Sequence, residues 1–452
     1  SPGQTVSNMV IVPVGLNGRI SLYNLNGAAQ VVVDVLGWFP ADAGSSNPTT
    51  TTTTPPPPVA FTRLVNAGTN GIATGGATGV SISADGRYVA FASPANNIVT
   101  GDPNPGTDVF VRDLETNSVT RVSVAASGGS ANGNSVEPSI SANGNRVAFH
   151  TNAALVLSDT NGVMDVYVRD LSAQTTTRVS SPLVPGTAGD STWPAISGNG
   201  RYVAFNSVSD NLVNGDTNGH IDVFVRDLNT GITERASVGT NGTQATGGFG
   251  SFDPDVSDDG NLVVFSSNET SLGGPDANVR HIYVRNRSLN TTTLLTRTPG
   301  NAPSSAGVAQ DPSISSDGAW VMFHSTMSDL VAGDFNGVED VFRVSATGGS
   351  MTRIGLSTDE GQGEGANTMI NANGRFITFS SDFIGQREVY RYDADLVTML
   401  RYSVDTNGVA ANGPSRDSAI SGDGRTIAFL TTATNLGGSV SGGTNVYVRF
   451  VP

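Results

Sequence analysis

Four stretches of the chain repeat a spacing of acidic and amide side chains that suits a hard cation. In each, an Asp is followed two residues later by Asn and six residues later by a second Asp. The four sets are Asp102, Asn104 and Asp108; Asp159, Asn161 and Asp165; Asp216, Asn218 and Asp222; Asp334, Asn336 and Asp340. Oxygens that converge from one loop in this way can bind Ca²⁺. The alternative is a structural Asx-turn whose last Asp accepts hydrogen bonds from backbone amides.

A second set of polar residues recurs just before segments such as Pro-Ser-Ile. One member of this set is a glycine, Gly79. The others are Glu137, Trp193, Asp253, Asp311, Asn367 and Asp417. If the fold brings these positions together, four carboxylates and an aromatic ring form a site for a cation, an amine or a cluster of sugar hydroxyls. The alternative is that an acid before proline merely ends a strand at a solvated rim.

Evidence for catalysis is thin. The chain has four histidines, and they are dispersed along it. It contains no His-Glu-x-x-His helix motif, no Gly-x-Ser-x-Gly elbow and no phosphate-binding loop. We therefore expect a protein that is not an enzyme. Glycosidases and lyases can nevertheless recruit carboxylates from separate parts of a fold, so a carbohydrate-active enzyme stays open as an alternative.

Composition excludes several partners and sites. The chain has 39 acidic and 24 basic residues, all of the latter Arg, and a net charge of -15. Such a surface repels nucleic acid and anionic membranes and favours cations or cationic partners. Without cysteine the chain forms no disulfide and no thiolate metal site. No apolar run is long enough for a membrane span.

The elements that must position these residues are short strands in a repeat. Seven Asn-Gly or Asp-Gly turns, from Asp85-Gly86 to Asp423-Gly424, follow one another at intervals of 50 to 60 residues. Each unit contains four strand-like segments and almost no helical periodicity. Repeats of this length with four short strands are typical of β-propeller blades.

The strand count predicts how the ring closes. The third strand of the unit appears seven times, the last over 445–449, and three residues follow it. The fourth strand of the last unit is therefore missing there, and its counterpart lies over 61–65, before the first unit. Such an exchange hides both sheet edges. We expect an all-β, seven-bladed propeller that is closed by an N-terminal outer strand, with the residues before Pro-Ser-Ile at the mouth of its channel.

The propeller is expected over residues 59–452, and two other regions precede it. Residues 1–40 predict three strands joined by short Asn-Gly turns, too few to bury a core alone. Residues 41–58 form a linker of Thr and Pro, which favours extended polyproline II and suits glycans on Thr49–Thr54 in an exported protein.

Two resemblances follow from these segments. The repeat that reads PSIS-x-NG-x-RVAFHT, DVYVRDL and TTTRVS resembles the TolB-like propeller repeats of bacterial exported proteins. Residues 3–39 are similar to the last strands of a β-domain of actinobacterial-type surface proteins. These resemblances imply a location outside the cell or on the surface of a bacterium, and they assign no activity.

Together the observations favour a structural or interaction protein. We expect the propeller to be a binding scaffold, stabilised by Ca²⁺ if the Asp motifs bind it, and residues 1–58 to contact a protein partner or another copy of the chain. The alternative is a lectin, glycosidase or lyase that uses the acidic mouth.

Overall fold

The computed structural model describes residues 60–452 apart from 103–105, 130–131, 185–187, 306, 335–337, 355–365 and 383–384. The three strands expected over residues 1–40 and the linker expected over 41–58 lie outside the described residues. Their proposed roles in assembly and glycan attachment therefore stay predictions.

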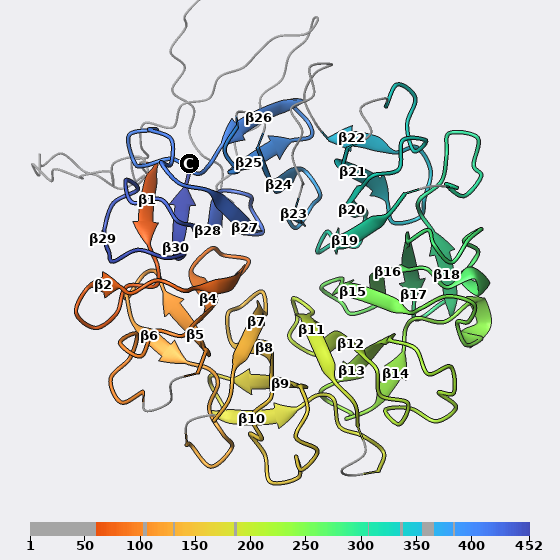
Figure 1. The fold of residues 1–452 in the computed structure, drawn as a ribbon, viewed down its shortest axis with the longest axis horizontal. Coiled ribbons are helices and arrows are strands. Elements are labelled where there is room, and N and C mark those ends of the chain that lie inside the picture. The colour runs from red at the N-terminus through yellow and green to blue at the C-terminus, as the bar shows by residue number, and fades with distance from the viewer. Residues whose placement is uncertain are drawn as a thin grey trace, which may run out of the picture. The chain divides into compact units, whose positions relative to one another are not determined.

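Seven antiparallel sheets of four strands surround a central opening (Figure 1). Blades one to three contain β3 (Thr78–Ile82), β4 (Tyr88–Ser93), β5 (Asp108–Asp113) and β6 (Val119–Arg121); β7 (Ser135–Ile140), β8 (Arg146–Thr151), β9 (Asp165–Asp170) and β10 (Thr175–Arg178); β11 (Ser191–Ile196), β12 (Tyr202–Ser207), β13 (Asp222–Asp227) and β14 (Thr233–Arg235). Blades four to six contain β15 (Ser251–Val256), β16 (Leu262–Ser267), β17 (His281–Asn286) and β18 (Thr291–Leu294); β19 (Ala309–Ile314), β20 (Trp320–Ser325), β21 (Asp340–Ser345) and β22 (Thr352–Ile354); β23 (Ala366–Ile370), β24 (Phe376–Ser381), β25 (Glu388–Asp393) and β26 (Thr398–Arg401). Blade seven contains β27 (Ser415–Ile420), β28 (Thr426–Thr431), β30 (Asn445–Phe450) and β1 (Phe61–Leu64). Two single-turn 3-10 helices, Thr240–Gly242 and Thr270–Leu272, lie in loops.

The hydrophobic core lies between neighbouring blades. The second and third strands of each blade are almost wholly buried, and each blade pairs an aromatic ring from one with a ring from the other. In blade two, Phe149 and Tyr167 have ring centroids 6.2 Å apart. These rings pack with aliphatic side chains such as Val111 and Val122 of blade one. Burial on both faces explains why these strands read as continuous apolar runs.

The recurring Asn-Gly and Asp-Gly turns also pack between blades. Gly144 has a φ of 72° and Gly260 a φ of 76°, in the region where glycine carries no steric penalty. A Cβ on Gly144 would overlap the Tyr88 ring of the preceding blade, and a Cβ on Gly260 would overlap Tyr202. The glycine therefore serves both the turn and the contact between blades.

The ring is closed as the sequence predicts. Strand β1 pairs antiparallel with β30, with Phe61 opposite Phe450 and Leu64 opposite Tyr447. The Val65 amide donates to the Val446 carbonyl at 2.8 Å, and the Phe61 and Phe450 rings stack with centroids 5.5 Å apart. A short parallel pair, β2 (Ile72–Ala73) with β29 (Ser439–Val440), adds a second contact between the first and last parts of the propeller.

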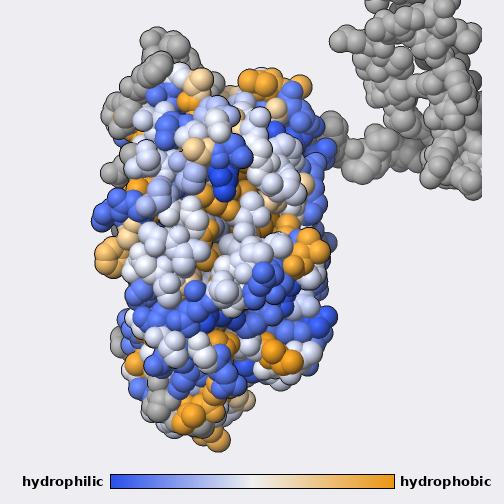
Figure 2. Space-filling model, turned by 90° about the vertical axis from the view of Figure 1, so that its right-hand side faces the viewer, coloured by the Kyte–Doolittle hydropathy of each residue, from blue (hydrophilic) through white to orange (hydrophobic). Residues whose placement is uncertain are grey.

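The side of the ring that Figure 2 shows is mostly polar. Figure 2 shows hydrophilic side chains over most of this side, with apolar side chains in small separate groups. Within the part of the chain that the structure describes, no helix is long and apolar enough to cross a membrane.

Removing the closing strand should weaken the whole ring. A chain that starts at Ala67 loses β1 together with the buried side chains of Leu64 and Val65. Burial of such side chains contributes about 1.5–3 kcal/mol each, so we expect the free energy of unfolding to fall by at least about 3 kcal/mol. Denaturant unfolding of this chain and of one that starts at Val59 provides the comparison. Equal stability would show that β1 does not close the ring.

Candidate functional site

An arginine from the outer strand lies against each pair of aspartates in the predicted calcium motifs. In blade two, Arg178 Nη2 is 2.7 Å from Asp165 Oδ1, and Arg178 Nη1 is 3.5 Å from Asp159 Oδ1. All three side chains are at most 4% exposed. The corresponding pairs are Arg121 with Asp102 and Asp108, Arg235 with Asp216 and Asp222, and Arg353 with Asp334 and Asp340. The guanidinium thus occupies the place between the carboxylates that an ion would need.

The arginine and the second aspartate of the motif change together from blade to blade. In blade four, His281 replaces that aspartate, and Leu294 takes the place of the arginine opposite Tyr283. In blade seven, Asn445 replaces the aspartate and Leu64 the arginine. The guanidinium is therefore present where a buried carboxylate needs a counter-charge and absent in these two blades, where the equivalent side chain is His or Asn.

The asparagines of the motifs make turn contacts. Asn161 Oδ1 accepts the Val163 amide at 3.3 Å, and Asn218 Oδ1 accepts the His220 amide at 3.1 Å. Asn104 and Asn336 lie outside the described residues. Among the residues that are described, no group of three or more His, Cys, Asp or Glu side chains could hold a metal ion. Calcium stays a prediction, and an ion could enter between these carboxylates only if the arginine moved away.

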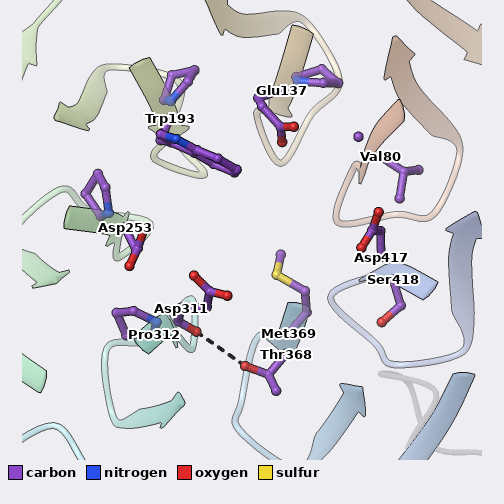
Figure 3. A pocket seen from close by; sticks show the side chains of 14 residues that line it. Val80, Glu137, Trp193, Asp253, Asp311, Pro312, Thr368, Met369, Asp417 and Ser418 are labelled. Atoms are coloured by element: carbon purple, nitrogen blue, oxygen red, sulfur yellow. Dashed lines mark hydrogen bonds between the residues drawn. The ribbon is translucent and has the colours of Figure 1, made fainter. Parts of the chain in front are cut away.

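The second predicted set meets in one cavity at the centre of the ring. Glu137, Trp193, Asp253, Asp311 and Asp417 line a cavity of about 340 Å³, which we call the funnel mouth (Figure 3). Gly79 lines the cavity too. Thr368 and Met369, which follow Asn367 in the sequence, also line it. The side chain of Asn367 itself lies outside the described part of the chain.

A bulge in each innermost strand directs these residues to the funnel mouth. The pairing of β7 with β8 shifts register between Val136 and Ser139, and the other six inner strands have the same shift. The bulged residues have positive φ: 58° at Gly79, 51° at Glu137, 54° at Trp193, 53° at Asp253, 46° at Asp311 and 48° at Asp417. Residues other than glycine rarely adopt this conformation, and a bulky one such as Trp is a clear outlier.

The carboxyl groups of the funnel mouth repel one another. Burial, and then the nearby charge of Asp417, raise the pKa of Glu137 to about 7. Burial and the charge of Asp311 also raise the pKa of Asp253, although the Ser266 hydroxyl donates to it at 2.9 Å. Arg280 and Arg416 approach Asp253 and Asp417 only to 3.9 Å and 3.7 Å. The mouth thus keeps a negative field with little internal compensation.

Asp311 is the exception, because a buried histidine holds it. His324 Nε2 is 2.9 Å from Asp311 Oδ2, while His324 Nδ1 bonds to Glu339. Burial lowers the pKa of His324, but the bonds to Asp311 and Glu339 outweigh burial and raise it to about 9. The imidazole is therefore a cation that orients Asp311. His150, at the same position in blade two, has a pKa lowered to about 4 by burial.

The cavity brings together five of the six side chains predicted at the funnel, and their role in binding stays a prediction; sequence reasoning missed their partners. The arginines were signalled by Thr-Arg-Val-Ser, which follows the motifs in blades one and two. The partnership of His324 with Glu339 has no sequence signal, since His324 lies on β20, Glu339 lies in the loop just before β21, and only His324 has a repeated counterpart.

Comparisons with known proteins support the fold. No protein-family model and no curated protein matches the chain. The β-propeller domain of the Trilobed protease from Pyrococcus furiosus has 11% identity and a TM-score of 0.52, over 83% of this chain and 95% of that chain. Oligogalacturonate lyase from Vibrio parahaemolyticus has 12% identity and a TM-score of 0.51, over 87% of this chain and 91% of that chain. TolB from Acinetobacter baumannii is also similar, with 14% identity and a TM-score of 0.41, over 71% of this chain and 64% of that chain.

The buried arginines should contribute strongly to stability. Replacing Arg178 with Ala leaves Asp159 and Asp165 buried without their counter-charge, and loss of one partner from such a pair costs about 3–5 kcal/mol. The control, Arg201→Ala, breaks a pair with Asp227 whose arginine is 40% exposed, so only a small loss of stability is expected. Denaturant unfolding measures both. Equal small losses, together with a melting temperature that falls in chelator, would mean that calcium rather than Arg178 neutralises the aspartates.

Glu137 should make stability depend on pH. Its folded pKa of about 7 lies above the unfolded value of about 4.3, so stability is lost as pH rises through 7. We expect Glu137→Gln to melt at a higher temperature than the original chain at about pH 8, and at the same temperature near pH 4. Glu115→Gln, at a site that is 69% exposed, is the control and should show no such gain. A pH-independent difference for Glu137→Gln would contradict the raised pKa.

Proposed function

We propose that the protein is a binding propeller of the bacterial exterior, which takes a cationic group of its ligand at the funnel mouth and does not act as an enzyme. The observation that carries this proposal is the contrast between two sets of acids. The aspartate pairs in four blades have an arginine from their own blade. The lining of the funnel mouth contains no arginine, and Glu137 has no ion pair among the described residues. A ligand that brings positive charge would relieve the repulsion there.

Backbone conformation supports a role for these side chains. Gly79 shows that the bulge accepts glycine, yet other blades place Glu, Trp or Asp in the same conformation. Each such residue costs about 1–3 kcal/mol of strain that glycine would avoid. Side chains that only ended a strand would not need this conformation, so the funnel residues fit a role in binding.

The histidine network argues against His324 as a general base. His324 is 2% exposed and both ring nitrogens are hydrogen-bonded. A protonated, enclosed imidazole cannot accept a proton from a substrate. It can orient Asp311 as a fixed anion for a bound ligand.

A carbohydrate ligand is the second candidate, and Trp193 is the observation in its favour. The side chain is 51% exposed within the cavity. Figure 3 shows its ring beside the carboxylates. Sugar rings pack on exposed aromatic faces while their hydroxyls donate to carboxylates. Assembly through residues 1–58 is a separate part of the proposal and concerns the region outside the described residues.

Replacing Trp193 should separate binding from stability. In Trp193→Gly, relief of backbone strain offsets the loss of a half-exposed ring, so we expect the free energy of unfolding to change by less than about 1 kcal/mol. Trp320→Gly is the control; its ring packs on Arg343 with the guanidinium carbon 4.1 Å from the ring centroid, and a loss of about 3 kcal/mol or more is expected. A thermal-shift screen with polyamines, arginine peptides and neutral oligosaccharides should find a ligand whose binding Trp193→Gly abolishes. Undiminished binding by the variant, or no ligand at all, would refute a binding role of the funnel mouth.

A further inference from the structure

The hydroxyl of Ser418 is a buried polar group that the fold leaves unused. Ser418 is 4% exposed, and its Oγ has no hydrogen-bond partner among the described residues. The residue lines the funnel mouth, and Figure 3 draws its side chain among those of the lining residues, next to Asp417. An unsatisfied buried hydroxyl is less favourable than an apolar side chain of similar size.

Other blades avoid this cost at the same strand position. The equivalent residues are Val80, Pro138, Pro194, Pro254, Pro312 and Thr368. Five of them have no polar side-chain atom, and the Thr368 hydroxyl donates to the Asp311 carbonyl oxygen at 3.3 Å. Ser418 is therefore the exception in the ring, and the residue lines the cavity that the proposed function assigns to a ligand.

Gly79 of blade one leaves space beside the Glu137 carboxyl group. A Cβ on Gly79 would lie 3.0 Å from Pro138 Cδ and 3.5 Å from Glu137 Oε2, so a side chain there would crowd the Glu137 carboxyl group. Blades seven, one and two thus form a notch, which we define by Asp417, Ser418, Gly79 and Glu137. Its polar atoms are carboxylate oxygens and one hydroxyl.

We propose that this notch binds a guanidinium group, with the Trp193 ring at the side of Glu137 offering an aromatic face; the proposal rests on the proposed function. A guanidinium has only donors, which suits a notch of acceptors. It is flat and weakly hydrated, so it enters a partly buried acidic cavity and stacks on aromatic rings more readily than an ammonium. A sugar would need donors as well as acceptors. A free guanidino compound and an arginine side chain of a polypeptide share this chemistry.

Calorimetric titration of the full chain tests the proposal. The probes are agmatine and acetyl-arginine amide, and acetyl-citrulline amide is the uncharged control of the same shape. We expect both guanidinium probes to bind and the citrulline probe to fail. Tighter binding of an arginine peptide than of agmatine would identify a polypeptide as the source of the guanidinium group. Equal binding of the two would identify a small molecule as the source. Both results support a guanidinium site.

Two variants locate the site. Ser418→Ala should weaken agmatine binding about fivefold or more, because one acceptor is lost, without lowering the melting temperature. The matched control is Thr378→Val, which removes another buried hydroxyl without a hydrogen-bond partner, from β24 and outside the cavity lining. It should bind agmatine as the original chain does.

Each contrary result has a separate meaning. Equal binding by Ser418→Ala, or equal binding of the citrulline probe, overturns the guanidinium notch. If neutral oligosaccharides bind and Trp193→Gly abolishes that binding while agmatine fails, the notch proposal is wrong, and binding at the funnel mouth stands with a carbohydrate as its ligand. If nothing binds at the funnel mouth, both proposals are wrong.

Discussion

The antiparallel pairing of β1 with β30 is the constraint on which the structure depends. Each blade buries its faces only against its two neighbours, so an open ring would expose apolar faces at its break. Pairing Phe61 with Phe450 and Leu64 with Tyr447 joins the first and last strands of the propeller, which are almost 400 residues apart in sequence. Closure also sets the distance between inner strands across the channel. Because the funnel mouth takes residues from separate blades, it can exist only in the closed ring.

Contacts between blades explain why the fold was predictable from sequence. The alternation of strands and turns is local chemistry, and the Asp-Gly and Asn-Gly turns mark each unit. The packing of Gly144 against Tyr88 adds a reason for the glycine that the turn alone does not give. Counting third strands was enough to predict seven blades and the displaced outer strand, because a sheet that lacks one strand requires a partner for its edge.

The candidate sites were predictable only in part. The funnel residues could be found because they occupy one position of a repeat and the fold brings that position to the channel. The structural role of the Asp motifs was harder to predict from the sequence. Asp165 and Arg178 lie 13 residues apart on adjacent strands, and only the register of β9 with β10 brings them together. Sequence analysis therefore found oxygen ligands without finding the guanidinium beside them. The bulge that turns Trp193 and Asp253 to positive φ has no sequence signal either, since Gly79 alone has the residue type that this conformation favours.

The two sets of acids differ in what the fold provides for them, and this difference separates structure from function. Within the blades, Arg178 and the Ser180 hydroxyl, the latter at 2.6 Å, bond to the buried Asp165. They offset part of the burial that raises its pKa, so these groups belong to the fold. At the funnel mouth, the chain combines strained backbone, mutually repelling carboxyl groups and the unused hydroxyl of Ser418. Each feature lowers stability and could be removed by a simpler residue. Gly79 shows this for the strained position and Pro138 for the position of Ser418, each at the equivalent place in another blade. A structural requirement explains the first set, whereas the second is explained by a ligand that supplies the missing donors and charge.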